Sequence, residues 1–248
     1  MVNQSEFRAR SGVVEKTILM VPLQLIKKKL FIFLFILVLL LIRPLGAAIG
    51  IKGGMSLSGL LSSTEDFRHV LGYEMNGLTM GNLMGFQVGF FKTFDLSGRL
   101  QIQPEISFAL RGGDAGSTFI YDDIIYKIKI CYAEFPLIFK YRIWTKGPFS
   151  AGIFSGPYAA LKLKAEKQMV IWNVEEKTTL DNVKTLDFGL LLGLGGEYDI
   201  GSGRVLLELR SGFGLKNMME VLPGTIRLYP DKDNIRNFYF SVLIGYAF

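Results

Sequence analysis

The chain has 248 residues, half of them hydrophobic, and a mean hydropathy of +0.32, which would ordinarily indicate membrane helices. Its one long apolar run, residues 30–42, falls short of the ~20 residues that a spanning helix needs, so helical bundles are excluded. The net charge of +6 lies mainly in residues 1–48. The remainder holds 21 basic and 20 acidic residues, so bulk charge gives no argument for a nucleic-acid partner.

The first 48 residues are predicted to be a signal peptide. Lysines 27–29 precede the apolar run, and a small-residue stretch follows that ends at Ala48, the predicted cleavage point. The alternative, an uncleaved anchor helix, is disfavoured by the short run. Signal peptides rarely carry so long a polar preface. We therefore expect translation to start nearer Met20 or Ile26, which would make residues 1–25 a start-site artefact.

From residue 49 onward, apolar residues alternate with polar or small ones, the period-two pattern of β-strands. In residues 99–111 every even position except Pro104 is a large apolar residue, and the odd positions are mostly polar. Strands of soluble sandwiches rarely alternate for so long, whereas a membrane-spanning strand needs ~9–11 residues. The pattern predicts eight strands: 49–60, 82–94, 99–111, 125–143, 148–164, 184–199, 203–214 and 236–248.

The predicted connections alternate in length. Short turns at 95–98, 144–147 and 200–202 are interleaved with long connections at 61–81, 112–124, 165–183 and 215–235. Short periplasmic turns, long outer loops and an even strand number are typical of outer-membrane barrels. The predicted fold is therefore an all-β, eight-stranded, antiparallel up-and-down transmembrane β-barrel over residues 49–248. We expect it in the lipid of the bacterial outer membrane, with both termini periplasmic.

The inward face of the predicted barrel is rich in charge. Eight strands leave an interior just wide enough for side chains, so a salt-bridged plug is favoured over a conduit. Two predicted pairings, Glu197 with Arg204 and Asp95 with Arg99, would place glycines opposite buried acids. The predicted lumen charge network is Glu105, Glu134, Lys140, Arg142, Glu197, Arg204, Glu208 and Arg210.

Catalytic and metal-binding chemistry has little support in the residues. His69 is the only histidine and lies in an unpatterned predicted loop, near serines and acids that could complete a hydrolase site. One histidine and the single Cys131 cannot build a transition-metal site, and no acidic run has calcium-loop spacing. We therefore predict no catalytic residues, no metal and no cofactor.

Several stretches, taken in order, resemble the small outer-membrane barrel proteins of Bacteroidetes, the PorT-like group. The resemblance implies the same fold and location. It also implies that the terminal aromatic strand, with Tyr246 and Phe248, is the signal that the barrel-assembly machinery reads. The family's asparagine after the first double glycine is replaced here by Met55-Ser56. The matching stretches are residues 51–60, 85–113, 132–143, 149–164, 187–200, 206–218 and 237–248.

The expected function is non-enzymatic. We expect a surface-binding or secretion- or assembly-accessory protein that acts through its long extracellular loops or its periplasmic rim. Residues 112–123 and 220–234 mix charge with aromatic residues and are candidates for binding a protein or glycan. The alternatives are a narrow pore or small-solute transporter and, less favoured, an outer-membrane hydrolase.

Overall fold

The computed structural model describes residues 48–61, 79–119, 122–171, 174–180, 183–218 and 235–248. The predicted signal peptide and the loop that holds His69 lie outside these residues. Nine strands make up the secondary structure of the described part. No helix in that part is long and apolar enough to cross a membrane.

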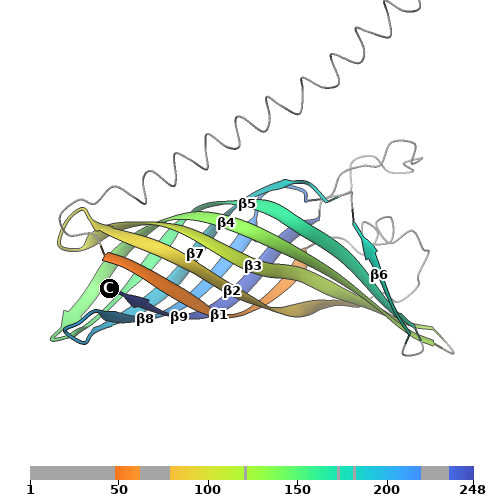
Figure 1. Cartoon of the computed structure of the whole chain (residues 1–248), viewed down its shortest axis with the longest axis horizontal. Helices are drawn as coiled ribbons and strands as arrows, with labels where there is room; N and C mark the ends of the chain where they lie inside the picture. Colours follow the sequence, from red (N-terminus) through yellow and green to blue (C-terminus); the bar gives the residue numbers. More distant parts are fainter. Residues whose placement is uncertain (1–47, 62–78, 120–121, 172–173, 181–182, 219–234) are drawn as a thin grey trace, which may run out of the picture. The chain divides into compact units, whose positions relative to one another are not determined.

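Eight of the strands close into an antiparallel barrel (Figure 1). Each pairs with its neighbour in the sequence, β1 pairs with β9 to close the ring, and β5 pairs with β7. The short β6 pairs only with β5, at one edge of the sheet. The bounds are β1 Ala48–Leu61, β2 Thr79–Asp95, β3 Leu100–Phe119, β4 Asp122–Lys146, β5 Phe149–Ile171, β6 Val174–Thr179, β7 Leu186–Asp199, β8 Arg204–Gly214 and β9 Arg236–Ala247.

Alternating burial confirms the predicted facing of the strands. Along β3, Gln103, Glu105 and Arg111 are buried in the lumen, while Phe108 on the other face is exposed. Along β7, β8 and β9, leucine, valine, isoleucine and phenylalanine side chains alternate outward, a third to two-thirds exposed. Such an apolar outer wall with a polar interior is the inverse of a soluble sandwich and suits a lipid surround.

Two predicted loops are wrong. Residues 112–124 and 165–183 are mostly strand: β3 runs to Phe119, β4 begins at Asp122, β5 runs to Ile171, and β6 follows. The prediction ended the strands where apolar alternation stops. Backbone pairing does not need apolar side chains, however, and the β3–β4 and β5–β6 ladders continue through polar residues.

The two predicted hairpin registers are also wrong, each by two residues. Arg204 pairs with Asp199 rather than Glu197, and Asp95 pairs with Gln101 rather than Arg99. Both turns are therefore placed differently from the prediction. In the β2–β3 turn, Leu96 and Ser97 donate to the carbonyl of Leu100. A shift of two keeps every side chain on its predicted face, which is why the inward set survives the error.

Candidate functional site

The most heavily charged part of the described barrel is a cluster buried at mid-lumen. Lys52 Nζ lies 2.5 Å from Glu105 Oε1 and 2.8 Å from Glu208 Oε2. Arg210 contacts the same two acids, at 3.0 Å and 2.7 Å. All four side chains are at most 5% exposed. They come from β1, β3 and β8, so the cluster ties together strands on opposite sides of the ring.

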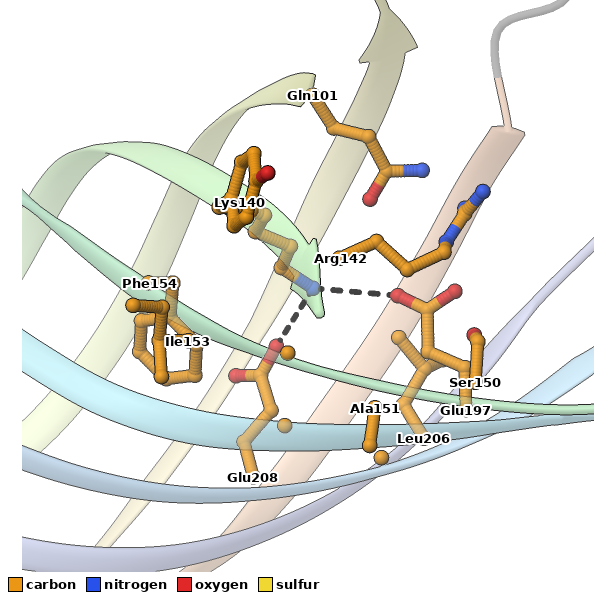
Figure 2. A pocket seen from close by; sticks show the side chains of 14 residues that line it. Gln101, Lys140, Arg142, Ser150, Ala151, Ile153, Phe154, Glu197, Leu206 and Glu208 are labelled. Atoms are coloured by element: carbon orange, nitrogen blue, oxygen red, sulfur yellow. Dashed lines mark hydrogen bonds and ion pairs between the residues drawn. The ribbon is translucent and has the colours of Figure 1, made fainter. Parts of the chain in front are cut away.

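The cluster extends toward the end of the barrel that carries the short turns. Lys140 Nζ lies 2.9 Å from Glu208 and 3.5 Å from Glu197, and Glu197 in turn lies 3.0 Å from Arg204. Figure 2 shows Lys140 between the two glutamates, beside a small cavity of about 30 Å³. The cavity is large enough for a water molecule but is not a channel. We call the set of Lys52, Glu105, Lys140, Glu197, Glu208 and Arg210 the ionic plug.

Charge in the ionic plug is balanced, with three cations and three carboxylates. Each carboxylate has at least one cation within 4.0 Å. A selectivity filter presents charge of one sign to a passing ion. In this plug every full charge is neutralised by a neighbour. Such an arrangement can hold the strands together, but it offers no uncompensated charge to a solute.

A second polar layer lies beyond the plug. Arg111 Nε donates to Glu134 Oε1 at 3.1 Å, and Arg111 Nη2 donates to Gln87 at 3.0 Å. The guanidinium carbon of Arg111 stands 3.7 Å from the ring centre of Tyr239, a cation–π stack. The space among these side chains and Tyr132 has no room for water, with a volume of about 0 Å³. The lumen is therefore filled at this depth.

The lumen is finally covered by an apolar cap on the side of the long connections. Its members come from β1, β4 and the segments that follow β6 and β8, and each is at most 6% exposed. Backbone bonds link these segments: Lys184 N donates to Met218 O, and Met218 N donates to Ile235 O. The cap consists of Leu60, Ile128, Ile130, Val183, Met218 and Ile235.

The structure brings most of the predicted lumen residues together. Glu105, Lys140, Glu197, Glu208 and Arg210 belong to the ionic plug, Arg204 pairs with Glu197 at its rim, and Glu134 lies in the second layer. Arg142 lines the same small cavity as Lys140, Glu197 and Glu208, and its guanidinium donates to the Gly98 carbonyl at 3.2 Å (Figure 2).

One central member of the plug was missed by sequence reasoning, namely Lys52. The signal was available. Ile51 and Met55 are exposed on the outer wall, so the residues between them at even positions face the lumen. A lysine at such a position, inside a spanning strand, predicts a buried acidic partner.

The C-terminal aromatic pair lies at the short-turn end of the barrel. The rings of Tyr246 and Phe248 stand edge to face, with centroids 5.0 Å apart. Phe248 follows the last residue of β9, is 69% exposed, and its amide donates to the carbonyl of Ile49. Its side chain therefore adds little packing to the folded barrel.

From the level of the apolar cap outward, the extended strands form a sheet that we call the platform: residues 113–119 of β3, 122–130 of β4, 164–171 of β5, and β6. Its outward face carries ion pairs of Lys164 with Glu166, at 2.6 Å, and of Lys177 with Glu175, at 2.9 Å. The hydrogen bond from Lys164 lowers the pKa of the Glu166 carboxyl below its usual value. The platform is therefore a charged, polar surface built on regular backbone.

The hydrolase alternative depends on a residue beyond the described part of the barrel. His69, the basis of the hydrolase alternative, lies outside it. No group of three or more histidine, cysteine or acidic side chains there is placed to hold a metal ion. Cys131 is a free, partly exposed thiol on the outward face.

Comparison with solved structures finds small outer-membrane barrels. OprG from Pseudomonas aeruginosa gives a TM-score of 0.43 at 11% identity, covering 82% of this chain and 96% of that one. Ail, the attachment invasion locus protein of Yersinia pestis, gives 0.36 at 11%, covering 82% and 99%. Neisserial surface protein A gives 0.36 at 13%, covering 81% and 97%.

No curated protein matches the chain by sequence. A family model does match it: the model described as the outer membrane protein beta-barrel domain aligns with residues 42–220, well over half of the sequence. This family assignment agrees with the closed eight-stranded ring, its apolar outer wall and its charged interior. The chain therefore belongs to the outer membrane protein beta-barrel domain family.

Proposed function

We propose that this outer-membrane barrel has no catalytic activity and serves as a surface-binding protein, with the platform as its binding element. The platform is the observation that carries the proposal. An outer-membrane strand needs ~9–11 residues to span, as in β8 and β9, whereas β4 has 25 and β5 has 23. The additional residues of β4 and β5 form ordered sheet that is not needed to cross the membrane. We therefore assign this sheet a role outside the lipid.

The orientation is part of the proposal. With an even number of barrel strands both termini leave at the same end, where the short turns also lie. We propose that this end is periplasmic and that residues 1–48 are removed as a signal peptide. The platform and the long connections then face the exterior. The resemblance to PorT-like barrels supports an accessory role in secretion or assembly at that surface.

The narrow pore is the less favoured function. A solute would have to pass the ionic plug, the Arg111 layer and the apolar cap in turn, each made of buried side chains. Opening such a path means breaking buried ion pairs, which costs about 3–5 kcal/mol for each uncompensated charge. Binding at the platform requires no such rearrangement.

The test of the binding role is removal of the platform alone. Replacing residues 115–126 and 167–178 each by Asn-Gly closes the two hairpins at the paired positions Asp114–Lys127 and Glu166–Thr179. Photo-crosslinking on intact cells then compares this trimmed variant with the full barrel. The crosslinker is placed at Thr179, the exposed β6 residue that both proteins retain, or, as control, in the β7–β8 turn. We expect partner adducts only from β6 of the full barrel. Equal adducts from the control site would remove the proposal.

A further inference from the structure

The lower edge of the platform carries a row of lysines on the same face of the sheet as the lipid-facing residues. On β4, Ile128 and Ile130 are buried in the cap, so Lys127 and Lys129 project to the opposite side. Toward the short-turn end of β4, the same side carries Cys131, Ala133, Phe135, Leu137, Phe139 and Tyr141. The lysines therefore prolong the row of side chains that contacts lipid.

The height of this row can be estimated from strand geometry. Residues 131–141 of β4 extend about 36 Å at ~3.3 Å per residue, and a tilt of ~45° reduces this to about 25 Å along the membrane normal. That is the height of the apolar band of an outer-membrane barrel. With the aromatic Tyr141 and Trp144 at the short-turn interface, Cys131 lies at the other edge of the band. Lys129 and Lys127 are thus at the level of the lipid headgroups.

Neighbouring strands place two more lysines on this face. Lys164 on β5 pairs with Cys131 on β4. Lys127 on β4 pairs with Gln168 on β5, which in turn pairs with Lys177 on β6. Adjacent strands are ~4.8 Å apart, so the side chains of Lys127 and Lys177 start about 10 Å from each other. Long lysine side chains bridge that gap readily, and their ammonium groups can converge on one multiply charged anion.

Charge on this face remains positive after internal pairing. Glu166 and Glu175 form ion pairs with Lys164 and Lys177, and Glu166 also lies opposite Lys129 in the β4–β5 ladder. The four lysines of this face therefore meet two carboxylates. Lys127 and Lys129 form no ion pair within 4.0 Å among the described residues. We propose that Lys127 and Lys129, assisted by Lys164 and Lys177, bind the phosphate groups of a lipid headgroup in the leaflet that meets the membrane-proximal edge of the platform. We call this set the lysine row.

A phosphorylated lipid fits this site better than a soluble anion. The lysine row meets the apolar band without a break, so one lipid can place its phosphates on the lysines and its chains on Phe135 and Leu137. Juxtamembrane lysines are attracted to anionic headgroups by about 1 kcal/mol each. A soluble polyanion would gain the charge contact but not the apolar one. The occupant inferred here is therefore a membrane lipid, and a soluble anion is an outcome of the test.

The test measures binding of diphosphoryl lipid A to the detergent-purified full chain by native mass spectrometry. The variant is Lys127→Gln/Lys129→Gln, and the matched control is Lys146→Gln, an exposed lysine at the other end of β4. We expect about thirtyfold weaker binding in the double variant, no change in the control, and little binding of lipid A without its phosphates. Circular dichroism before the titration establishes that all three proteins are folded.

Three results would overturn the inference: equal loss in the Lys146 control, undiminished binding of dephosphorylated lipid A, or displacement of lipid A by millimolar inorganic phosphate. The choice of the outer leaflet rests on the orientation in the proposed function. It is tested separately, by labelling Lys177→Cys in a Cys131→Ser background with an impermeant maleimide on intact cells. If Lys177→Cys is labelled but lipid A does not bind, only this inference fails. If it is not labelled, the orientation fails.

Discussion

Replacing Lys52 with methionine should be among the most damaging single changes in the barrel. The ammonium group lies 2.5 Å from Glu105 and 2.8 Å from Glu208, and the side chain is 5% exposed. Methionine keeps most of the volume but removes the charge, so the balanced plug acquires one uncompensated carboxylate. Breaking a buried pair in this way costs about 3–5 kcal/mol, a large part of the ~5–15 kcal/mol that holds a typical domain folded.

The double variant Lys52→Met/Glu105→Gln separates the charge effect from loss of packing. It restores the balance of two cations and two carboxylates. We therefore expect it to unfold less easily than the sum of the single changes implies, with a coupling of about 0.5–3 kcal/mol. The control is Lys146→Met, which is exposed and should change stability by no more than ~0.5 kcal/mol.

The assay is urea unfolding of the refolded barrel in lipid vesicles, followed by far-UV circular dichroism, with linear extrapolation to zero urea. If Lys52→Met is as stable as Lys146→Met, Lys52 is not part of a compensated buried cluster. Strict additivity in the double variant would likewise refute the electrostatic explanation.

Three further changes test the lipid-facing wall, the backbone at the base of the platform and the C-terminus. Leu192 points outward on β7 and is 55% exposed, so Leu192→Arg should lower the free energy of unfolding by about 2–4 kcal/mol in the same assay. Ile200→Arg, at the membrane edge, should lower it by at most ~1 kcal/mol. The reverse ranking would refute the assignment of Leu192 to the lipid-facing side. Gly112→Ala should destabilise the barrel by about 1–3 kcal/mol, because Gly112 has φ +147° and an added Cβ would meet the Ile128 carbonyl oxygen. An unchanged urea midpoint would contradict this expectation. Deleting Phe248 should lower the outer-membrane yield in cells while detergent refolding stays nearly unchanged; equal losses would leave only the packing explanation.

The side of each strand that faces the lipid was the feature of the fold that the sequence predicted best. A strand in lipid must turn apolar residues outward at every second position, so Glu105, Glu208 and Arg210 could be assigned to the lumen without any structure. Pairing across the lumen could not be assigned in the same way. The contact of Lys52 with Glu208 joins residues 156 positions apart and depends on the closure of the ring by β1 and β9.

The platform could not be predicted by the same reasoning, because it leaves the environment that makes the pattern readable. Outside the lipid, both faces of a strand tolerate polar residues, so the alternation is lost at residues such as Asp114 and Glu166, beyond the predicted strand ends at 111 and 164, although the backbone ladder continues. The two hairpin registers were predicted wrongly for a related reason. Turn length, not facing, sets whether Arg204 pairs with Asp199 or Glu197, and both choices satisfy the alternation.

The closed lumen is the central claim, and single-channel recording of the pure, refolded full chain in planar bilayers tests it most directly. Among the described residues, the ionic plug, the Arg111 layer and the apolar cap fill the lumen at three depths, so the membrane current should stay at its baseline. Stable, repeated openings of nanosiemens size would contradict the claim and would favour the pore over the surface-binding function.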